Sequence, residues 1–222
     1  AIFVNGACGD VNPRITNGTF DDARELGGLL GQAVERGLAT SVPVSADRVG
    51  AARQILKLEL LPPPGRLCCE ATHGISWLRG IYRRYSPGGE KRSRYLVAQA
   101  ALEWIRETKR WRRQGAPPRR RALEIQGIRL GDLAFLGFEG ELFAQYQLDI
   151  EPESPFQPTI VCGLANGCVG YLPTADEYSR GGYEIDEAYK VYGETQMFGP
   201  ESEQAIRSGA RQVLAALKAE NQ

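Results

Sequence analysis

The sequence predicts a single α/β domain, residues 1–222, in which a mixed β-sheet is flanked by helices. Three observations lead to this prediction. Apolar runs of strand length alternate along the chain with segments of helical periodicity. Two of the strands are joined by a tight Gly-Asp turn, which indicates an antiparallel pair within the sheet. The chain has 222 residues, 42% of them hydrophobic, which is enough to bury a sizeable core.

The first third of the chain predicts a strand, a helix and a second strand. Residues 1–4 are apolar and run into a glycine-rich loop, so we expect a core strand that delivers this loop to a site. Thr19 and the acidic residues after it form a capping box, which predicts a helix that ends near Gly37. Leucines alternate with charged residues over 56–60, the period of a half-buried strand. The proline-rich segment 62–65 ends that strand.

The middle of the chain begins with a weak pattern over residues 66–93, which we interpret as loops and short pieces. A helix begins near Tyr95 and runs into the basic stretch 106–121. Two apolar runs, 123–130 and 133–138, follow it. They flank Gly-Asp, so they are expected to form a β-hairpin.

The last third predicts a helix after residues 138–143, a core strand over 159–164 and a final helix whose apolar face contains Ile206 and Leu217. The first two elements are connected to glycine-containing loops. Loops at strand ends commonly present functional side chains.

Three such loops combine a polar or ionisable residue with glycines: 9–13, 140–143 and 167–174. Each has an ordinary structural explanation as well. Gly-Asp and Gly-Glu are common at turns and helix starts, where a carboxylate gains about 0.3–1 kcal/mol from the helix dipole without any function. The residues alone therefore leave both interpretations open for each loop.

Taken together, five segments resemble a known family. In chain order they read GACGDVNP, FEGELF, LANGCVGYLPTADEY, GGYE and VYG. This series resembles the neutral/alkaline (non-lysosomal) ceramidases and their bacterial relatives. The resemblance extends from Ala1 to about Gly199 and includes the final helix, although residues 66–121 add little to it. It implies that the chain is the C-terminal half of a catalytic domain whose N-terminal part is missing.

The resemblance also implies a zinc-dependent hydrolase that cleaves the N-acyl bond of ceramide-like lipids. Such a protein would be secreted or periplasmic and would contact the membrane at its periphery. Its zinc would be bound by two histidines, a glutamate and a tyrosine. The glutamate falls on Glu141 and the tyrosine on Tyr171, whereas the histidines would lie in the missing N-terminal part. The single histidine here, His73, is therefore interpreted as a surface or packing residue.

A second functional tyrosine of the family falls on Tyr183. The resemblance implies that Gly9, Asp10 and Asn12 shape the substrate side of the site, and that Asp10 and Asn12 are candidate catalytic residues together with Tyr183. Zinc with one open position makes a hydroxide from bound water near neutral pH. A phenol such as Tyr183 is suited to donate to the oxyanion that forms. The structural alternative is that Tyr171 and Tyr183 are core aromatics.

Two positions depart from the family pattern. Glu139 stands where the family has proline before Gly-Glu, and Asn12 stands where the family has a serine implicated in activity. An amide can bind substrate but cannot replace a hydroxyl nucleophile. Either that serine is dispensable for the zinc-water route, or the substrate differs. With only Glu141 and Tyr171 as ligands, we expect this chain alone to bind zinc weakly and to be inactive.

Two other functions remain open. A nucleic-acid-binding module would use the basic run Arg106–Arg121 with Trp104 and Trp111, but 27 basic and 27 acidic residues give no net charge, so we expect no nucleic-acid partner. The other function is that of a non-catalytic binding protein that kept the fold. Asn12 favours it, because asparagine stands where the family has a serine implicated in activity. The five cysteines are expected to be mostly buried thiols, with a Cys162–Cys168 disulfide as an alternative in an exported protein.

Overall fold

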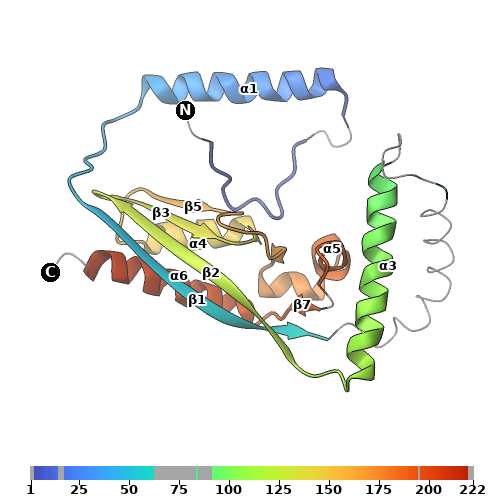
Figure 1. Cartoon of the computed structure of the whole chain (residues 1–222). Coiled ribbons are helices and arrows are strands. Elements are labelled where there is room, and N and C mark those ends of the chain that lie inside the picture. Colours follow the sequence, from blue (N-terminus) through green and yellow to red (C-terminus); the bar gives the residue numbers. More distant parts are fainter. Residues whose placement is uncertain (1–2, 15–17, 63–83, 85–91, 195, 220–222) are drawn as a thin grey trace.

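A five-stranded mixed sheet forms the centre of the chain. Figure 1 shows the computed structural model, which describes residues 3–14, 18–62, 84, 92–194 and 196–219. The strand order is β5-β3-β2-β1-β7, with β3 and β5 parallel and the other neighbours antiparallel. The predicted mixed α/β fold is therefore confirmed. The strands are β1 (Val49–Leu61), β2 (Arg119–Leu130), β3 (Leu133–Phe138), β5 (Thr159–Cys162) and β7 (Met197–Phe198).

The predicted hairpin is the link between β2 and β3. Leu130 pairs with Leu133 across the turn. Gly131 adopts φ +60°, and a Cβ there would lie 2.0 Å from the carbonyl oxygen of Ser45, so only glycine fits this turn. The Gly131 amide also donates to the Arg48 carbonyl at 2.7 Å, which fixes the start of β1 beside the turn.

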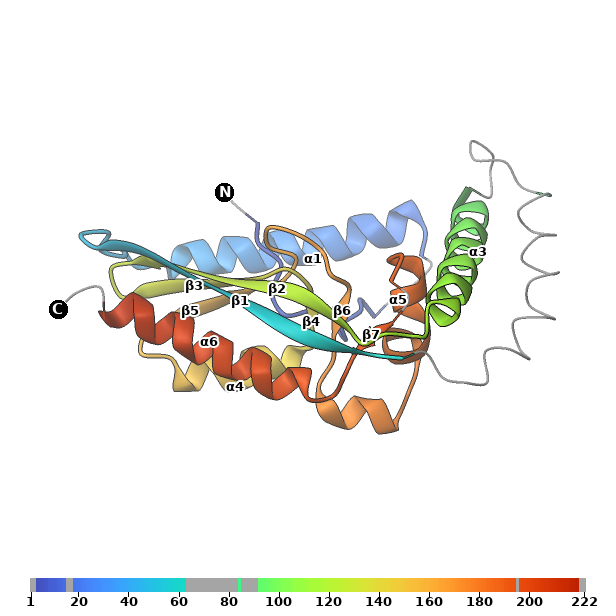
Figure 2. The same ribbon diagram turned by 60° about the horizontal axis from the view of Figure 1, so that its bottom comes forward.

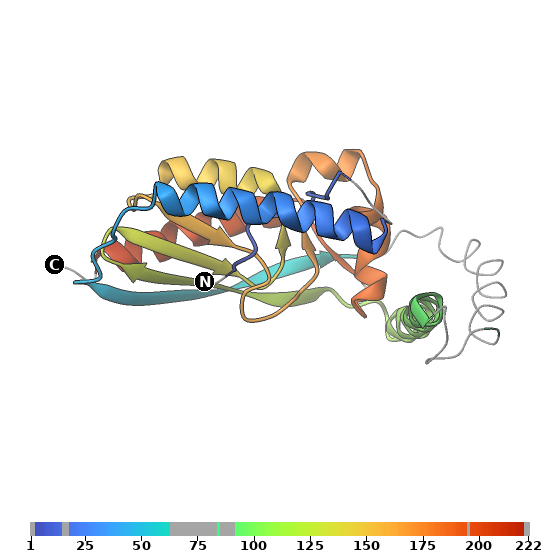
Figure 3. The same ribbon diagram turned by 90° about the horizontal axis from the view of Figure 1, so that it is seen from above.

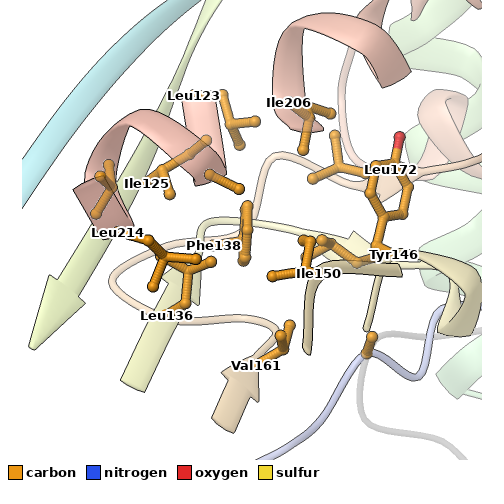
Figure 4. Packing of buried hydrophobic residues seen from close by; sticks show 14 of the residues in the cluster. Leu123, Ile125, Leu136, Phe138, Tyr146, Ile150, Val161, Leu172, Ile206 and Leu214 are labelled. Carbon is orange, nitrogen blue, oxygen red and sulfur yellow. The ribbon is translucent and has the colours of Figure 1, made fainter. Parts of the chain in front are cut away.

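The hydrophobic core lies between the sheet and two helices, α4 (Ala144–Glu153) and α6 (Ser202–Ala219), which lie on the same side of the sheet (Figure 2). The predicted apolar face of the last helix is buried, and Ile206 and Leu217 are fully covered. Figure 4 shows Phe138 of β3 among side chains from both helices, including Ile150 and Leu214. This packing fixes the strand end from which the candidate site begins.

Helix α1 (Phe20–Ala39) begins at Thr19 with the predicted capping box, in which the Thr19 and Asp22 side chains each accept from the other's backbone amide. It ends at Thr40, close to the predicted end. None of its residues is buried, and Leu30 and Val34 are about half exposed. Figures 1 and 3 show α1 running across the outside of the molecule, away from α6.

The expected core strand at the start of the chain is wrong. The described residues from Phe3 to Gly6 have no strand structure, and the Phe3 side chain is 77% exposed. The Asn5 carbonyl accepts one hydrogen bond from the Gly163 amide, at 3.1 Å. A strand needs a partner along its length, and an apolar sequence alone does not supply one.

Helix α3 (Arg92–Arg113) confirms the second predicted helix and packs beside α5 (Ala188–Val191). Trp104 is 5% exposed and meets Tyr189 edge to face. Trp111 is 3% exposed and donates to the Pro117 carbonyl at 2.9 Å. Both indoles are therefore packed inside the protein, so neither offers the open face on which a nucleic-acid base would stack.

Other sequence expectations concern cysteines, histidine and the membrane. Cys8, Cys162 and Cys168 have free thiols, so the alternative disulfide is not formed. His73, Cys68, Cys69 and nearly all of the segment 66–93 lie outside the described residues. Among the helices that the structure describes, none combines the length and apolarity needed to cross a bilayer.

Gly127 of β2 provides a test of the packing between sheet and helix. A Cβ at this position would lie 2.7 Å from both Val213 and Leu217 of α6. We expect Gly127→Val to lower the free energy of unfolding by about 1–3 kcal/mol, because extra methyl groups overpack this contact. Chemical denaturation with circular dichroism measures the change.

The matched control is Gly31→Ala in α1, where an added Cβ would meet nothing within 4 Å. This change should stabilise the helix by up to about 1 kcal/mol, because alanine is the better helix former. Equal stability of Gly127→Val and the unsubstituted chain would contradict the described packing of α6 on β2.

Candidate active site

Two short strands bring the predicted zinc ligands together. β4 (Glu141–Leu142) and β6 (Tyr171–Leu172) pair in parallel, with Glu141 opposite Tyr171. The Glu141 amide donates to the Gly170 carbonyl at 2.9 Å. A Cβ on Gly140 would lie 2.9 Å from that same carbonyl oxygen, so the two segments approach this closely only because residue 140 is glycine. A carboxylate and a phenol thirty positions apart are therefore direct neighbours.

Two tyrosines, Tyr171 and Tyr192, hydrogen-bond the Glu141 carboxylate, and a third, Tyr183, packs against Tyr171. Tyr171 meets Tyr183 edge to face at 6.0 Å between ring centroids and meets Tyr192 in the same way at 6.1 Å. Tyr183 begins a short π-helical segment, Tyr183–Glu187, and is 52% exposed. The Tyr192 hydroxyl donates a hydrogen bond to Glu141 Oε1. The structure thus places Tyr171 and Tyr183 together with Glu141, as the sequence predicted.

Burial and the Glu141 carboxylate both raise the pKa values of the neighbouring phenols. Burial raises the pKa of Tyr171 above its ordinary value, and the negative charge of Glu141 and a hydrogen bond to it raise this pKa further. For Tyr192, burial is again the largest cause, followed by the hydrogen bond to Glu141. Both phenols are therefore neutral donors at physiological pH. A cation beside Tyr171 would reverse this effect, because positive charge favours the phenolate.

The opening loop contacts the same strand through Gly9. Its amide donates to the Leu142 carbonyl at 2.7 Å. A Cβ on Gly9 would lie only 2.4 Å from the Glu141 carbonyl oxygen, so no larger residue fits here without moving backbone. Next to it, the thiol of Cys8 has a raised pKa because of burial and the charges of Glu141 and Asp10. The loop is thus fixed against the candidate ligand.

Asp10 has a structural contact that the sequence did not predict. Its Oδ1 accepts a hydrogen bond from the Ala144 amide, the first residue of α4, at 2.7 Å. The helix has no cap from its own N-cap residue, Phe143, so Asp10 supplies the missing acceptor. The predicted catalytic role of Asp10 remains a prediction. Asn12 lies two residues further along and is exposed.

The third predicted loop also converges on this place. The amide of Leu164 donates to the Gly140 carbonyl at 3.0 Å, and that of Val169 donates to the Glu139 carbonyl at 2.6 Å. Glu139 Oε2 accepts from the Glu124 amide of β2 at 2.8 Å. The Glu139 side chain is therefore bound to the central sheet rather than to the site.

The donor atoms fit part of a zinc site. Glu141 and Tyr171 offer two oxygen ligands, and zinc accepts oxygen in four-coordinate sites that also contain nitrogen or sulfur. In the described part of the chain, no group of three or more His, Cys, Asp or Glu side chains is arranged to hold a metal ion. The remaining ligands would have to come from outside these residues.

Tyr192 is the neighbour of Glu141 that residue-by-residue reasoning missed. It belongs to the Val191-Tyr192-Gly193 segment, one of the five motifs that carry the resemblance. The motif indicated that this segment is part of the resemblance, but the sequence separation between Tyr192 and Glu141 did not predict that their side chains meet.

The fold was compared with known proteins. No protein-family model and no curated protein matches the sequence. The crystal structure of neutral ceramidase from Pseudomonas aeruginosa is similar over 95% of this chain, with a TM-score of 0.53 and 19% sequence identity. The chain has a ceramidase-like fold.

The ceramidase-like chain spans only 35% of the length of that neutral ceramidase. A second structure, a ceramidase complexed with C2, aligns over 45% of this chain and 15% of its own, with 24% identity and a TM-score of 0.37. At that score the second alignment adds nothing to the argument. The fold likeness therefore concerns one part of a larger ceramidase architecture.

Replacing Asp10 tests whether its carboxylate caps α4. We expect Asp10→Ala to lower the free energy of unfolding by about 0.5–2 kcal/mol, because the Ala144 amide loses its acceptor. Asp10→Asn is the matched control, since asparagine is an equally good cap, and it should stay close to the unsubstituted chain. Thermal and denaturant unfolding measure both variants. Equal losses in the two variants would show that the charge of Asp10, rather than capping, matters.

Proposed function

We propose that this chain is part of a zinc-dependent hydrolase that cleaves the N-acyl amide bond of a ceramide-like lipid. The observation that carries the proposal is the parallel pairing of Glu141 with Tyr171, with Tyr183 beside them. The ceramidase-like fold over 95% of the chain supports the same function. The reaction class is the one that the resemblance to ceramidases implies, and two oxygen donors beside a phenol are compatible with metal-assisted hydrolysis.

In this proposal Glu141 and Tyr171 hold the zinc together with histidines from outside the described residues. The bound metal would supply a hydroxide near neutral pH and polarise the amide carbonyl. Tyr171 would give up its phenolic proton on metal binding. Tyr183, half exposed and next to Tyr171, would donate its hydroxyl hydrogen to the oxyanion that develops on the carbonyl.

The opening loop would form the substrate side of the site. Gly9 brings it into contact with the Glu141 backbone, and Asp10 holds it to α4. Asn12, exposed two residues later, would hydrogen-bond polar groups of the lipid through its amide. Asparagine cannot act as a hydroxyl nucleophile, so the reaction would depend on the metal-bound water. The resemblance to ceramidases favours a secreted or periplasmic protein, and a lipid substrate favours contact with the membrane at its periphery.

A binding protein without catalysis is the second candidate function. Two observations favour it: Asn12 stands at the family's serine position, and the described residues supply only two oxygen ligands. Such a protein would bind the same lipid class but would leave the amide bond intact. The presence or absence of two zinc-binding histidines in the same gene product distinguishes the candidates.

The hydrolase is tested by fatty-acid release from a fluorescent N-acylsphingosine, measured in the gene product that contains this chain. We expect zinc-dependent turnover, and we expect Tyr183→Phe to lower kcat by about 10²–10³ with little change in KM, the usual effect of removing one oxyanion donor. Tyr178→Phe is the matched control, because the Tyr178 hydroxyl donates to the Phe198 backbone instead. Lipid binding without turnover would contradict the hydrolase and support the non-catalytic binding protein instead.

Zinc binding by the 222-residue chain alone provides a separate test. We expect isothermal titration to give only weak binding, because a phenol must lose its proton and two oxygen ligands are too few. Glu141→Gln should abolish the remaining signal, whereas Glu153→Gln on α4, whose carboxylate pairs with Arg211, should not. Tight one-to-one binding by this chain would contradict the expected dependence on histidines from elsewhere.

A further inference from the structure

Tyr192 differs from Tyr146 and Tyr178 in what its hydroxyl binds. The Tyr146 hydroxyl donates to the Pro173 carbonyl, and the Tyr178 hydroxyl donates to the Phe198 carbonyl. These two phenols satisfy backbone groups, which is a structural use. Tyr192 instead donates to Glu141 Oε1, a carboxylate oxygen of the proposed metal ligand. Its side chain is 40% exposed, so burial is not its main contribution.

The ring of Tyr192 is placed by Gly170. A Cβ on Gly170 would lie 3.4 Å from Tyr192 Cδ2, and Gly170 has φ +95°, which favours glycine. The Gly170 carbonyl also accepts the Glu141 amide at 2.9 Å. One residue therefore contacts both the backbone that carries the carboxylate and the phenol that binds it.

The turn that carries Tyr192 is held on two sides. The Tyr192 amide donates to the Ala188 carbonyl of α5 at 3.2 Å, and Gly193 takes φ +77° to make the turn. Glu194 then forms an ion pair with Arg121 of β2, in which the side chains are 27% and 30% exposed. This half-buried pair connects the turn to the central sheet.

We propose that Tyr192 is a positioning residue that fixes the Glu141 carboxylate for cation binding. The hydrogen bond from Tyr192 to Oε1 restricts rotation of the Glu141 carboxylate, so the carboxylate is oriented before a cation binds. The ion pair of Arg121 with Glu194 holds the turn from which Tyr192 acts. This inference rests on the proposed zinc site. It adds a residue, Tyr192, that hydrogen-bonds a metal ligand without touching the metal. Such partners commonly change metal affinity about 10–100-fold.

The test uses the 222-residue chain with ¹³C-labelled glutamate carboxyls and compares Tyr192→Phe with Tyr178→Phe by NMR. Glu141→Gln assigns the Glu141 signal. We expect Tyr192→Phe to shift that signal while circular dichroism stays unchanged, because the ring remains and only the hydroxyl is lost. Tyr178→Phe removes a phenol hydrogen bond elsewhere and should leave the signal in place. Glu194→Gln should shift it in the same direction by a smaller amount.

A second measurement tests the consequence for metal binding. In the gene product that contains this chain, zinc competition with a chromogenic chelator should show affinity reduced about 10–100-fold by Tyr192→Phe and unchanged by Tyr178→Phe. A Glu141 signal that does not move in Tyr192→Phe overturns the positioning role, as does unchanged zinc affinity. If the unsubstituted gene product binds no zinc, the proposed hydrolase fails, while the carboxyl signal still decides whether Tyr192 orients Glu141.

Discussion

The backbone ladder between β4 and β6 is the constraint on which the candidate site depends. It is only two residues long in each strand, yet it sets Glu141 against Tyr171. A pair of two-residue strands has little stability of its own. Its stability comes from the adjoining buried residues Leu142 and Leu172, which belong to the main core, so the site is held by packing that lies directly beneath it.

Glycines make this arrangement sterically feasible. The loop at Gly9, the strand at Gly140 and the segment at Gly163 each approach another backbone more closely than a Cβ would permit. Close backbone contact is a common reason for glycine at sites where several loops meet. Here it brings three segments, distant in sequence, around one carboxylate. Burial at this place, together with the carboxylate, raises the pKa of Tyr171 and of Tyr192, so backbone geometry and side-chain chemistry are linked at the same point.

Much of the fold could be predicted from the sequence, because its signals are local. The capping box at Thr19, the alternation along β1 and the Gly131 turn each depend on a few neighbouring residues, and each prediction is confirmed. The motif order also predicted that Glu141, Tyr171 and Tyr183 belong together. Side-chain partners were beyond prediction, since the Asp10 contact with α4 and the Tyr192 contact with Glu141 join residues far apart in sequence. The predicted strand at the apolar start of the chain was wrong, because an apolar composition does not show whether a neighbouring strand is available to pair with it.

Helix α1 has a consequence for the dynamics of the molecule. It contains Gly27, Gly28, Gly31 and Gly37, and an added Cβ at any of them would touch nothing. Isolated helices are marginal in water, and tertiary contacts provide most of the stability of helices in proteins. With no buried residue, α1 is held by its own backbone bonds, by the caps at its two ends and by an exposed ion pair between Arg24 and Asp21. Its amide protons should therefore be the earliest to exchange with deuterated solvent, while those of the β1–β2 ladder exchange last.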